Sequence, residues 1–327
     1  MAYHLKSGHH VPDELKRIAR EELESAAANL RGEGGIDRSK AIHETRKSIK
    51  KVRAVLRLMR DELGATFGRE NTRLRNLGLM LSGTRDAAVM IQTFDTVLDK
   101  FRPELGRRKL PSIRRVLVAR KQEAEKRSSA VVERAAGSLR AAASRVKSWP
   151  LEEDGFEALA PGLERNFRRG RAALATAQKN PKAENFHELR KRVKCHWYHV
   201  RLLELLWTDV MTAYESSLKE LETWLGDDHN LAVLLEKISS RFPAKKSEID
   251  LLSGLIQRYQ DELRKNAVSL AERVYAEKPN RFGTRMEHLW EAWESQPKSF
   301  KEHEKERRKG PASAPKAQKA VSRKSAA

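Results

Sequence analysis

The chain has 327 residues, and its 66 Lys and Arg against 45 Asp and Glu give a formal net charge of +21. This excess indicates an anionic partner such as nucleic acid, polyphosphate or an anionic membrane surface. Cys195 is the single cysteine, which excludes an intrachain disulfide and indicates a reducing compartment. No segment approaches the ~18 uncharged apolar residues of a membrane span, and the polar N-terminus does not resemble a signal peptide. We therefore expect a soluble protein of the cytoplasm.

Taken in chain order, the apolar spacing predicts helices throughout, and no sustained period-two alternation predicts a strand. In the first half, the expected helices span residues 13–30, 37–63, 69–82, 86–102 and 111–147. In the second half, they span residues 155–179, 183–207, 210–225, 229–240, 245–277 and 284–294. The expected fold is all-α, built from two similar helical bundles in tandem over residues 8–150 and 151–295.

Residues 297–327 differ in composition from the rest of the chain. After Glu306 this tail contains seven cations and no carboxylate, and its other residues are Ala, Ser, Pro, Gly, Gln and Val. Low-complexity sequence of this kind is predicted to be disordered. We interpret the basic tail as a non-specific polyanion tether, with a solubilising end as the alternative.

One basic stretch occurs twice in the chain. Residues 42–59 read IHETRKSIKKVRAVLRLM, and residues 186–203 read FHELRKRVKCHWYHVRLL. The apolar residues of both copies alternate by three and four, which is typical of a helix packed in a bundle. The polar residues that recur at an offset of 144 are His43, Glu44, Arg46, Lys47, Lys50 and Arg57 in the first copy and His187, Glu188, Arg190, Lys191, Lys194 and Arg201 in the second.

The recurring cations and the histidine share one side of each helix. At ~100° per residue, they fall within roughly a third of the helix circumference, beside the apolar positions. A solvated helix face usually mixes charge signs, whereas this face carries four cations, a histidine and no carboxylate. Like charges at this spacing repel by a few tenths of a kcal/mol per pair. Two such faces at one offset therefore indicate a polyanion site.

A second element repeats at the same offset. The segment LSGTRDAAV in the first half is matched by LGDDHNLAV in the second. We interpret Asp86 and Asn230 as N-caps of new helices, each preceded by a glycine that supplies a tight turn. Arg85 and His229, just before these caps, are placed to reach the basic face.

The two His-x-x-Arg-Lys-x-x-Lys helices and the segments that follow them resemble the CHAD family (conserved histidine α-helical domain) over residues 8–295. The resemblance implies two four-helix bundles related by a pseudo-twofold axis, with the basic helices facing a central channel. It further implies binding of inorganic polyphosphate, association with polyphosphate granules, and no catalytic activity of the domain itself. Many relatives are fused to a CYTH triphosphatase domain, whose alternating-glutamate motif is missing here, so the chain resembles a stand-alone member.

Carried over by position, the family's basic residues fall on both helices. They are His43, Arg46, Lys47, Lys50, Arg53 and Arg57 in the first copy and His187, Arg190, Lys191, Lys194 and Arg201 in the second. Arg85 and His229 join them as candidate polyphosphate-binding residues. The two copies differ where Trp197 matches Arg53 and where His229 matches Arg85.

The residue types suit polyphosphate, which carries negative charge on every phosphate and has no bases to stack or recognise. Lys ammonium groups and Arg forks along a rigid helix provide donors for successive phosphate oxygens. The histidines can donate ring N–H groups as well. Surrounding cations should lower the histidine pKa without ligand, and bound phosphate should raise it. We therefore expect tighter binding at mildly acidic pH.

Neither a metal nor a cofactor is expected. His43 and Glu44 resemble half of a zincin helix, but Lys47 stands where the second histidine ligand is needed, and a cation there repels a metal. Asp227 and Asp228 come nearest to the carboxylate cluster that Mg²⁺ would need, and turn chemistry accounts for them. Glu44 and its repeat are expected to form salt bridges that orient the arginines.

The main alternative is a general polyanion- or nucleic-acid-binding protein that uses the basic groove and the tail. The aromatic content of 6% leaves few platforms for base stacking, and no recognised nucleic-acid-binding motif is present. The tail is a candidate for weak nucleic-acid binding. A third hypothesis is a scaffold that docks on acidic proteins or storage granules.

Overall fold

The fold is all-α, as predicted. This computed structural model describes residues 3–126, 129–238, 242–297 and 299–300, which contain helices and no strand. The helices of the first half are α1 (Val11–Leu30), α2 (Arg38–Leu58), α3 (Arg60–Leu63), α4 (Ala65–Met80), α5 (Ser82–Lys100), α6 (Arg102–Leu105), α7 (Pro111–Lys126) and α8 (Ser129–Val146). Those of the second half are α9 (Ala160–Lys179), α10 (Ala183–Leu202), the 3-10 helix η1 (Glu204–Leu206), α11 (Thr208–Lys237), α12 (Lys246–Val274) and α13 (Pro279–Glu294). No described helix is long and apolar enough to cross a membrane.

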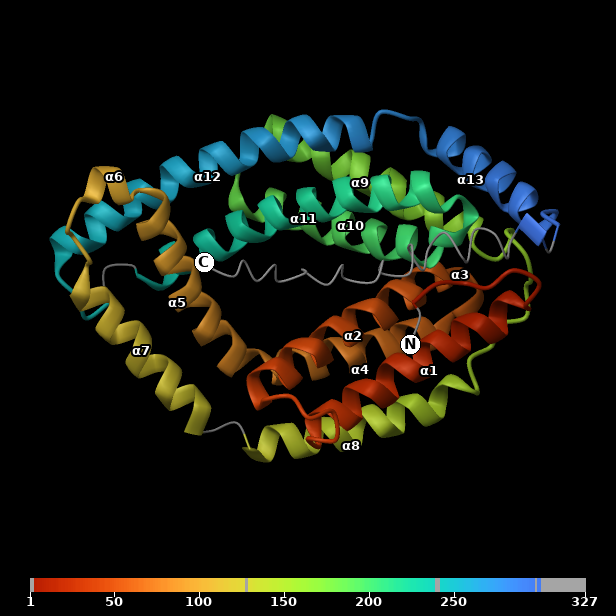
Figure 1. Ribbon diagram of the computed structural model, residues 1–327, viewed down its shortest axis with the longest axis horizontal. Helices are drawn as coiled ribbons and strands as arrows, with labels where there is room; N and C mark the ends of the chain where they lie inside the picture. The colour runs from red at the N-terminus through yellow and green to blue at the C-terminus, as the bar shows by residue number, and fades with distance from the viewer. Residues whose placement is uncertain (1–2, 127–128, 239–241, 298, 301–327) are drawn as a thin grey trace, which may run out of the picture.

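The internal repeat of the sequence is also a repeat of the fold. In the first half α1 packs on α2 and α8, and in the second half α9 packs on α10 and α13 (Figure 1). Equivalent side chains make equivalent contacts, because Arg53 Nε donates to Asn71 Oδ1 (3.0 Å) and Trp197 Nε1 donates to Glu215 Oε1 (3.1 Å). Both pairs are related by the same offset of 144. The two halves meet where α2 packs on α10 and α5 packs on α11.

The buried apolar side chains form two clusters, and each cluster draws on both halves of the chain. The larger one joins α1, α2, α4 and α8 to α9, α10, α13 and the first part of α11. The smaller one joins Phe94 and Val97 of α5 to Leu231, Leu234 and Ile238 at the end of α11. The predicted division into residues 8–150 and 151–295 stays a prediction. The predicted tail lies mostly outside the described residues.

The first basic helix, α2, begins where the sequence predicts but ends earlier. Asp37 caps it, since the side-chain Oδ1 accepts from the backbone N–H of Lys40 at 3.1 Å. Its buried positions are those of the predicted apolar side, such as Ile42, Ile49 and Val52. The helix ends at Met59, after which the short α3 follows. The segment predicted as one helix over 37–63 therefore consists of two successive helices, α2 and α3.

The predicted N-caps at Asp86 and Asn230 are wrong. Helix α5 already starts at Ser82, and α11 runs without a break for 30 residues through both Gly226 and Asn230. Glycine in a helix interior costs about 1 kcal/mol relative to alanine. Burial of leucines at helical spacing on both sides of Gly226 outweighs that cost, because burying one leucine contributes about 1.5–3 kcal/mol.

Candidate functional site

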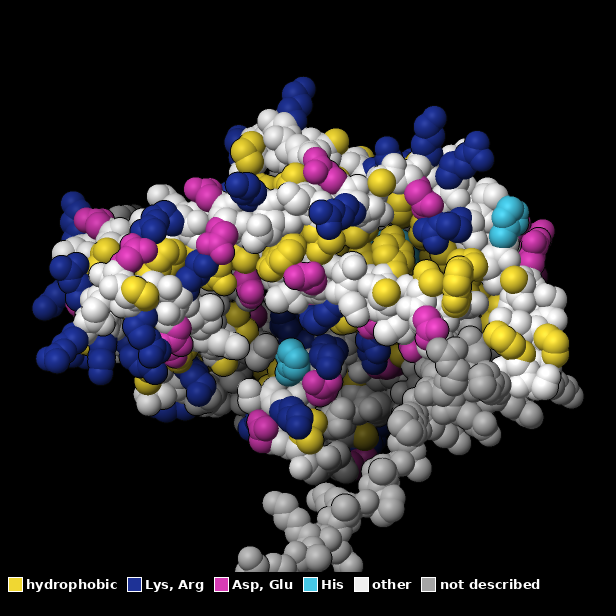
Figure 2. All heavy atoms as spheres, turned by 45° about the horizontal axis from the view of Figure 1, so that its top comes forward, with side chains coloured by type: hydrophobic (Ala, Val, Ile, Leu, Met, Phe, Trp, Pro, Cys, Tyr) yellow, Lys and Arg dark blue, Asp and Glu magenta, His cyan; other side chains and the backbone are white. Residues whose placement is uncertain are grey.

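A cavity of about 580 Å³ lies between the two basic helices, α2 and α10, and the helices α5 and α11. Six Lys and Arg side chains line it together with two histidines and three carboxylates. Figure 2 shows a hollow in this face of the molecule in which Lys and Arg side chains gather, with a histidine at its edge. The cations are Arg46, Lys47, Lys50, Arg190, Lys194 and Lys219, the histidines are His43 and His229, and the carboxylates are Asp86, Glu222 and Asp227.

On the α2 wall of the cavity, Arg46 is held by groups of two other helices. Its Nη1 donates to the carbonyl oxygen of Gly78 at 2.9 Å, and its Nη2 lies 3.8 Å from Asp86 Oδ1. Lys47 pairs with Glu44 at 2.8 Å. The salt bridge predicted for Glu44 is therefore present, with a lysine as its partner. These contacts hold the cations at the cavity surface.

Lys50 is a cavity cation whose surroundings disfavour its charge. It is half-buried, and within the described residues it has no hydrogen bond and no ion pair. Burial lowers the pKa of Lys50 to about 7, and the neighbouring cations Lys194, Arg190 and Arg46 add to this effect. A desolvated ammonium group among like charges is stabilised by any anion that reaches it.

On the α10–α11 wall, three cations share one carboxylate. Glu222 accepts from Lys194 at 2.6 Å and from Lys219 at 3.2 Å, and it lies 3.5 Å from Arg190 Nη2. Burial lowers the pKa of Lys194, and Arg190 adds to this, while Glu222 opposes it. Sequence analysis missed Glu222 and Lys219. The recurrence of a cation at residue 75, one offset before Lys219, was the signal available in the sequence.

Two histidines of the second half stack on each other. The rings of His187 and His229 lie 4.1 Å apart at 29°, and His229 lines the cavity. Burial lowers the pKa of His229 to about 4, and His187, Arg190 and Lys50 contribute. Burial likewise lowers the pKa of His187, followed by Lys191 and Arg190. Both shifts have the direction expected for a site without ligand, although burial is the larger cause.

Several predicted residues lie outside the cavity lining. Arg53 bonds to Asn71, and burial, with Arg57 and Arg75, lowers its pKa to about 10. Arg57 donates to the Arg53 carbonyl at 3.1 Å. Arg201 pairs with Glu215 at 3.1 Å. The remaining ones are His187, which stacks behind His229, Lys191, which pairs with Glu188, and Arg85, whose side chain lies outside the described part of the structure.

The two aspartates considered for Mg²⁺ lie within α11 and not in a turn. Asp228 is buried and accepts from Arg264 at 2.7 Å and from Gln260 at 3.0 Å, so it ties α11 to α12. Asp227 lines the cavity, and burial raises its pKa. Among the residues that the structure describes, no group of three or more His, Cys, Asp or Glu is arranged to hold a metal ion.

Comparisons with known proteins agree with this fold. The family model of the CHAD domain matches residues 17–239. The fold is similar to the crystal structure of the CHAD domain from the plant Ricinus communis, with a TM-score of 0.61 and 16% identity over 82% of this chain and 94% of that one. It is also similar to PptA from Streptomyces chartreusis, with a TM-score of 0.56 and 14% identity over 82% of this chain and 100% of that one. No curated protein matches the chain. The match to the family model covers more than half of the sequence, and the chain belongs to the CHAD domain family.

Proposed function

We propose that the protein binds inorganic polyphosphate in the cavity between α2 and α10, without catalysing a reaction, and that this binding brings it to polyphosphate granules. The observation that supports the proposal is the gathering of six cations and two histidines from two repeats around one cavity. Multiple ammonium and guanidinium donors at rigid positions suit an anion with many equivalent oxygens. Membership of the CHAD family supports the same ligand.

The aromatic residues at the cavity favour polyphosphate over nucleic acid. Trp197 is 9% exposed and Tyr198 is 2% exposed, and their rings stack on each other with centroids 4.9 Å apart. Lys219 and Arg201 lie over the Trp197 ring at 5.0 and 5.4 Å. These rings are therefore committed to packing and to cation–π contacts, and they offer no open face for base stacking.

A competition titration tests the proposal. The full-length protein holds labelled long-chain polyphosphate at ~0.15 M salt, and duplex DNA, RNA or unlabelled polyphosphate is added at matched phosphate concentration. We expect only polyphosphate to displace the label efficiently. Equal displacement by DNA or RNA would instead identify a general polyanion-binding protein, which is the main alternative.

Variants locate the binding site in the same assay. Replacement of Arg46, Lys50, Arg190 and Lys194 by Ala is expected to abolish binding. A double variant, Arg46→Ala with Lys50→Ala, leaves all three partners of Glu222 in place and should still lose most of the affinity. The matched control replaces four exposed cations away from the cavity, Arg107, Arg108, Lys109 and Lys147, by Ala. Loss of affinity in this control equal to that of the cavity variant would contradict the site.

A further inference from the structure

The two walls of the cavity share an arginine and a lysine position but differ in the acceptor beside the arginine. Arg46 and Arg190 are related by the offset of 144, and so are Gly78 and Glu222. Arg46 donates to the backbone carbonyl of Gly78, whereas Arg190 lies beside the carboxylate of Glu222. The repeat therefore places a neutral carbonyl on one wall and an anionic side chain on the other.

Glu222 is an internal anion at the place that suits a phosphate. Its side chain is 6% exposed and its two oxygens are shared by Lys194, Lys219 and Arg190. Burial by itself would raise the pKa of Glu222, but Lys194 and Arg190 hold it below its usual value, so the carboxylate is ionised at neutral pH. Three cations around two oxygens is the arrangement that a phosphate group would also select.

The first wall has no such buried anion, because its carboxylate, Asp86, is 46% exposed and lies 3.8 Å from Arg46 Nη2. Gly78 has no side chain, and a Cβ built there would meet only Ile49 Cγ2, at 3.8 Å, so the space beside it is open. Lys50, the repeat of Lys194, has no hydrogen bond or ion pair within the described residues. An anion that enters the cavity therefore meets an uncompensated cation on α2 and compensated cations on α10 and α11.

We propose that Glu222 is a specificity-determining residue, a built-in counter-ion that a phosphate chain must displace from Arg190, Lys194 and Lys219 before it can occupy the second wall. This inference rests on the proposed function. A short anion can bind at Lys50 on the first wall without displacing Glu222. A chain long enough to reach the second wall must displace Glu222 from its three cations, and this lowers its affinity by the free energy of those contacts. The built-in carboxylate thus limits the affinity for long polyphosphate and has little effect on pyrophosphate and tripolyphosphate.

Removing the counter-ion tests this effect. In Glu222→Gln, the side chain keeps its size and an acceptor but loses its charge. We expect the Kd for long-chain polyphosphate to fall by about tenfold, which corresponds to ~1.4 kcal/mol, while the Kd for tripolyphosphate changes by less than about threefold. Glu220→Gln, which removes the same charge from an exposed position of α11, is the matched control and should change neither constant.

Adding a counter-ion to the first wall is the reciprocal test, and it does not depend on the folding of the Glu222 variant. Gly78→Glu should weaken tripolyphosphate binding by about tenfold or more, whereas Gly78→Gln, of the same size but neutral, should weaken it far less. Equal changes for short and long chains in Glu222→Gln, or equal effects of Gly78→Glu and Gly78→Gln, would overturn the role of Glu222 and leave polyphosphate binding intact. A wild-type protein that binds neither ligand would overturn the proposed function itself.

Discussion

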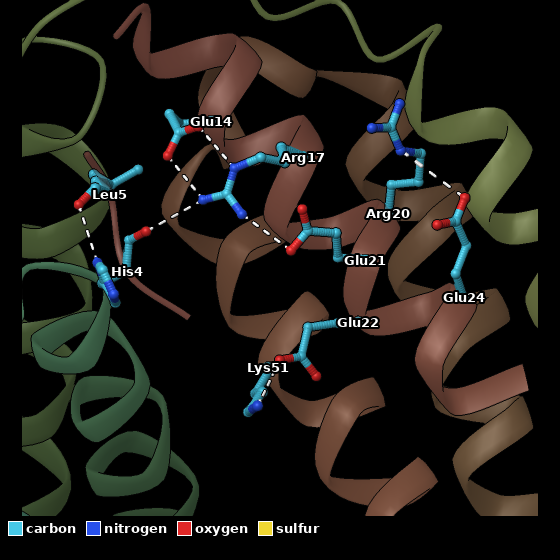
Figure 3. Close-up of polar contacts among 9 residues, drawn as sticks. All are labelled: His4, Leu5, Glu14, Arg17, Arg20, Glu21, Glu22, Glu24 and Lys51. Carbon is cyan, nitrogen blue, oxygen red and sulfur yellow. Dashed lines mark hydrogen bonds and ion pairs between the residues drawn. The ribbon is translucent and has the colours of Figure 1, made fainter. Parts of the chain in front are cut away.

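Lys50 and Lys51 are neighbours on α2, yet their ammonium groups lie in opposite surroundings. Lys51 points toward α1, where Glu22 accepts from it at 2.5 Å (Figure 3). Glu22 also accepts from Ser48 at 2.7 Å. On α1 itself, Arg17 pairs with two carboxylates of the same helix, Glu14 and Glu21. Lys50 lies at the cavity, where its nearest charged neighbours are mainly cations.

The difference separates cations that stabilise the fold from cations of the proposed polyphosphate site. On the α1 face the partly buried cations Arg17 and Lys51 each pair with a carboxylate, so their charge is compensated within the chain. At the cavity six Lys and Arg side chains line the same space as three carboxylates, so part of the positive charge has no internal counter-ion. One side of α2 is thus compensated within the chain, and another side carries the cations of the proposed binding site.

The largest expected effect is on stability: substitutions of these two lysines should change the free energy of unfolding in opposite directions. Lys51→Met leaves the carboxylate of Glu22 without its buried partner and should lower the free energy of unfolding by about 3 kcal/mol. Lys50→Met removes an uncompensated cation and should raise it by about 2 kcal/mol near pH 6. Urea denaturation of both variants and of the wild type measures the two changes.

The pH dependence of the Lys50 effect provides the control. The pKa of Lys50 is lowered from 10.5 to about 7 in the folded protein. The penalty for its charge is therefore complete below about pH 7 and declines as the pH rises toward 10.5, where both states lose the proton. The gain in Lys50→Met should shrink over the same range. A gain that is constant with pH would show that packing, and not charge, causes it.

The next largest effect concerns binding above neutral pH. Lys50 loses its proton in the free protein above about pH 7, and bound phosphate would restore it. Binding then takes up a proton, so the affinity for polyphosphate should fall by up to about tenfold per pH unit above this value. Lys50→Arg keeps its charge and should flatten the profile, measured by fluorescence anisotropy at constant ionic strength. An unchanged slope in this variant would exclude Lys50 as the titrating group.

A smaller expected effect is on the salt dependence of polyphosphate binding, and it should differ between two exposed lysines. Lys219 and Lys191 are 52% and 55% exposed, and each pairs with a glutamate three residues away, but only Lys219 lines the cavity. Lys219→Gln should reduce the slope of log affinity against log salt by about 0.7, whereas Lys191→Gln should leave it unchanged. Titrations at three salt concentrations suffice. The reverse order would place the phosphate chain along the outer side of α10.

The smallest expected effect is on the affinity for polyphosphate below neutral pH. His229 is neutral in the free protein at neutral pH, because burial and its cationic neighbours lower its pKa to about 4. Phosphate should raise this pKa, so the affinity should increase by about threefold as the pH falls from 7 to 5.5. His229→Asn should lose this increase and keep the decline above pH 7. Retention of the acid increase would assign it to another group, such as His43.

The helices were predictable because apolar residues recur at helical spacing along most of the chain. The continuous helix through Gly226 was not predictable, because glycine is a strong local signal for a turn and nothing local reveals two apolar clusters that hold α11 straight.

The cavity residues were predictable only in part. Arg46, Lys50 and their repeats lie where helical geometry places them, but Arg53 and Arg201, near the far ends of the same faces, pair with Asn71 and Glu215 instead. Long side chains follow the acceptors that a neighbouring helix offers, and these are set by tertiary packing. Glu222 was missed because comparison of the two copies emphasised what they share, while Glu222 is a position at which they differ.

The continuous helix α11 has a consequence for folding during synthesis. At 1.5 Å per residue its 30 residues span about 45 Å, and they connect the larger apolar cluster, the cavity wall and the smaller cluster. During synthesis, Phe94 and Val97 of α5 leave the ribosome long before Leu231 and Leu234, which cover them. The nascent first half therefore presents an uncovered apolar face until α11 is complete, and this interval is the stage at which chaperones would engage the chain.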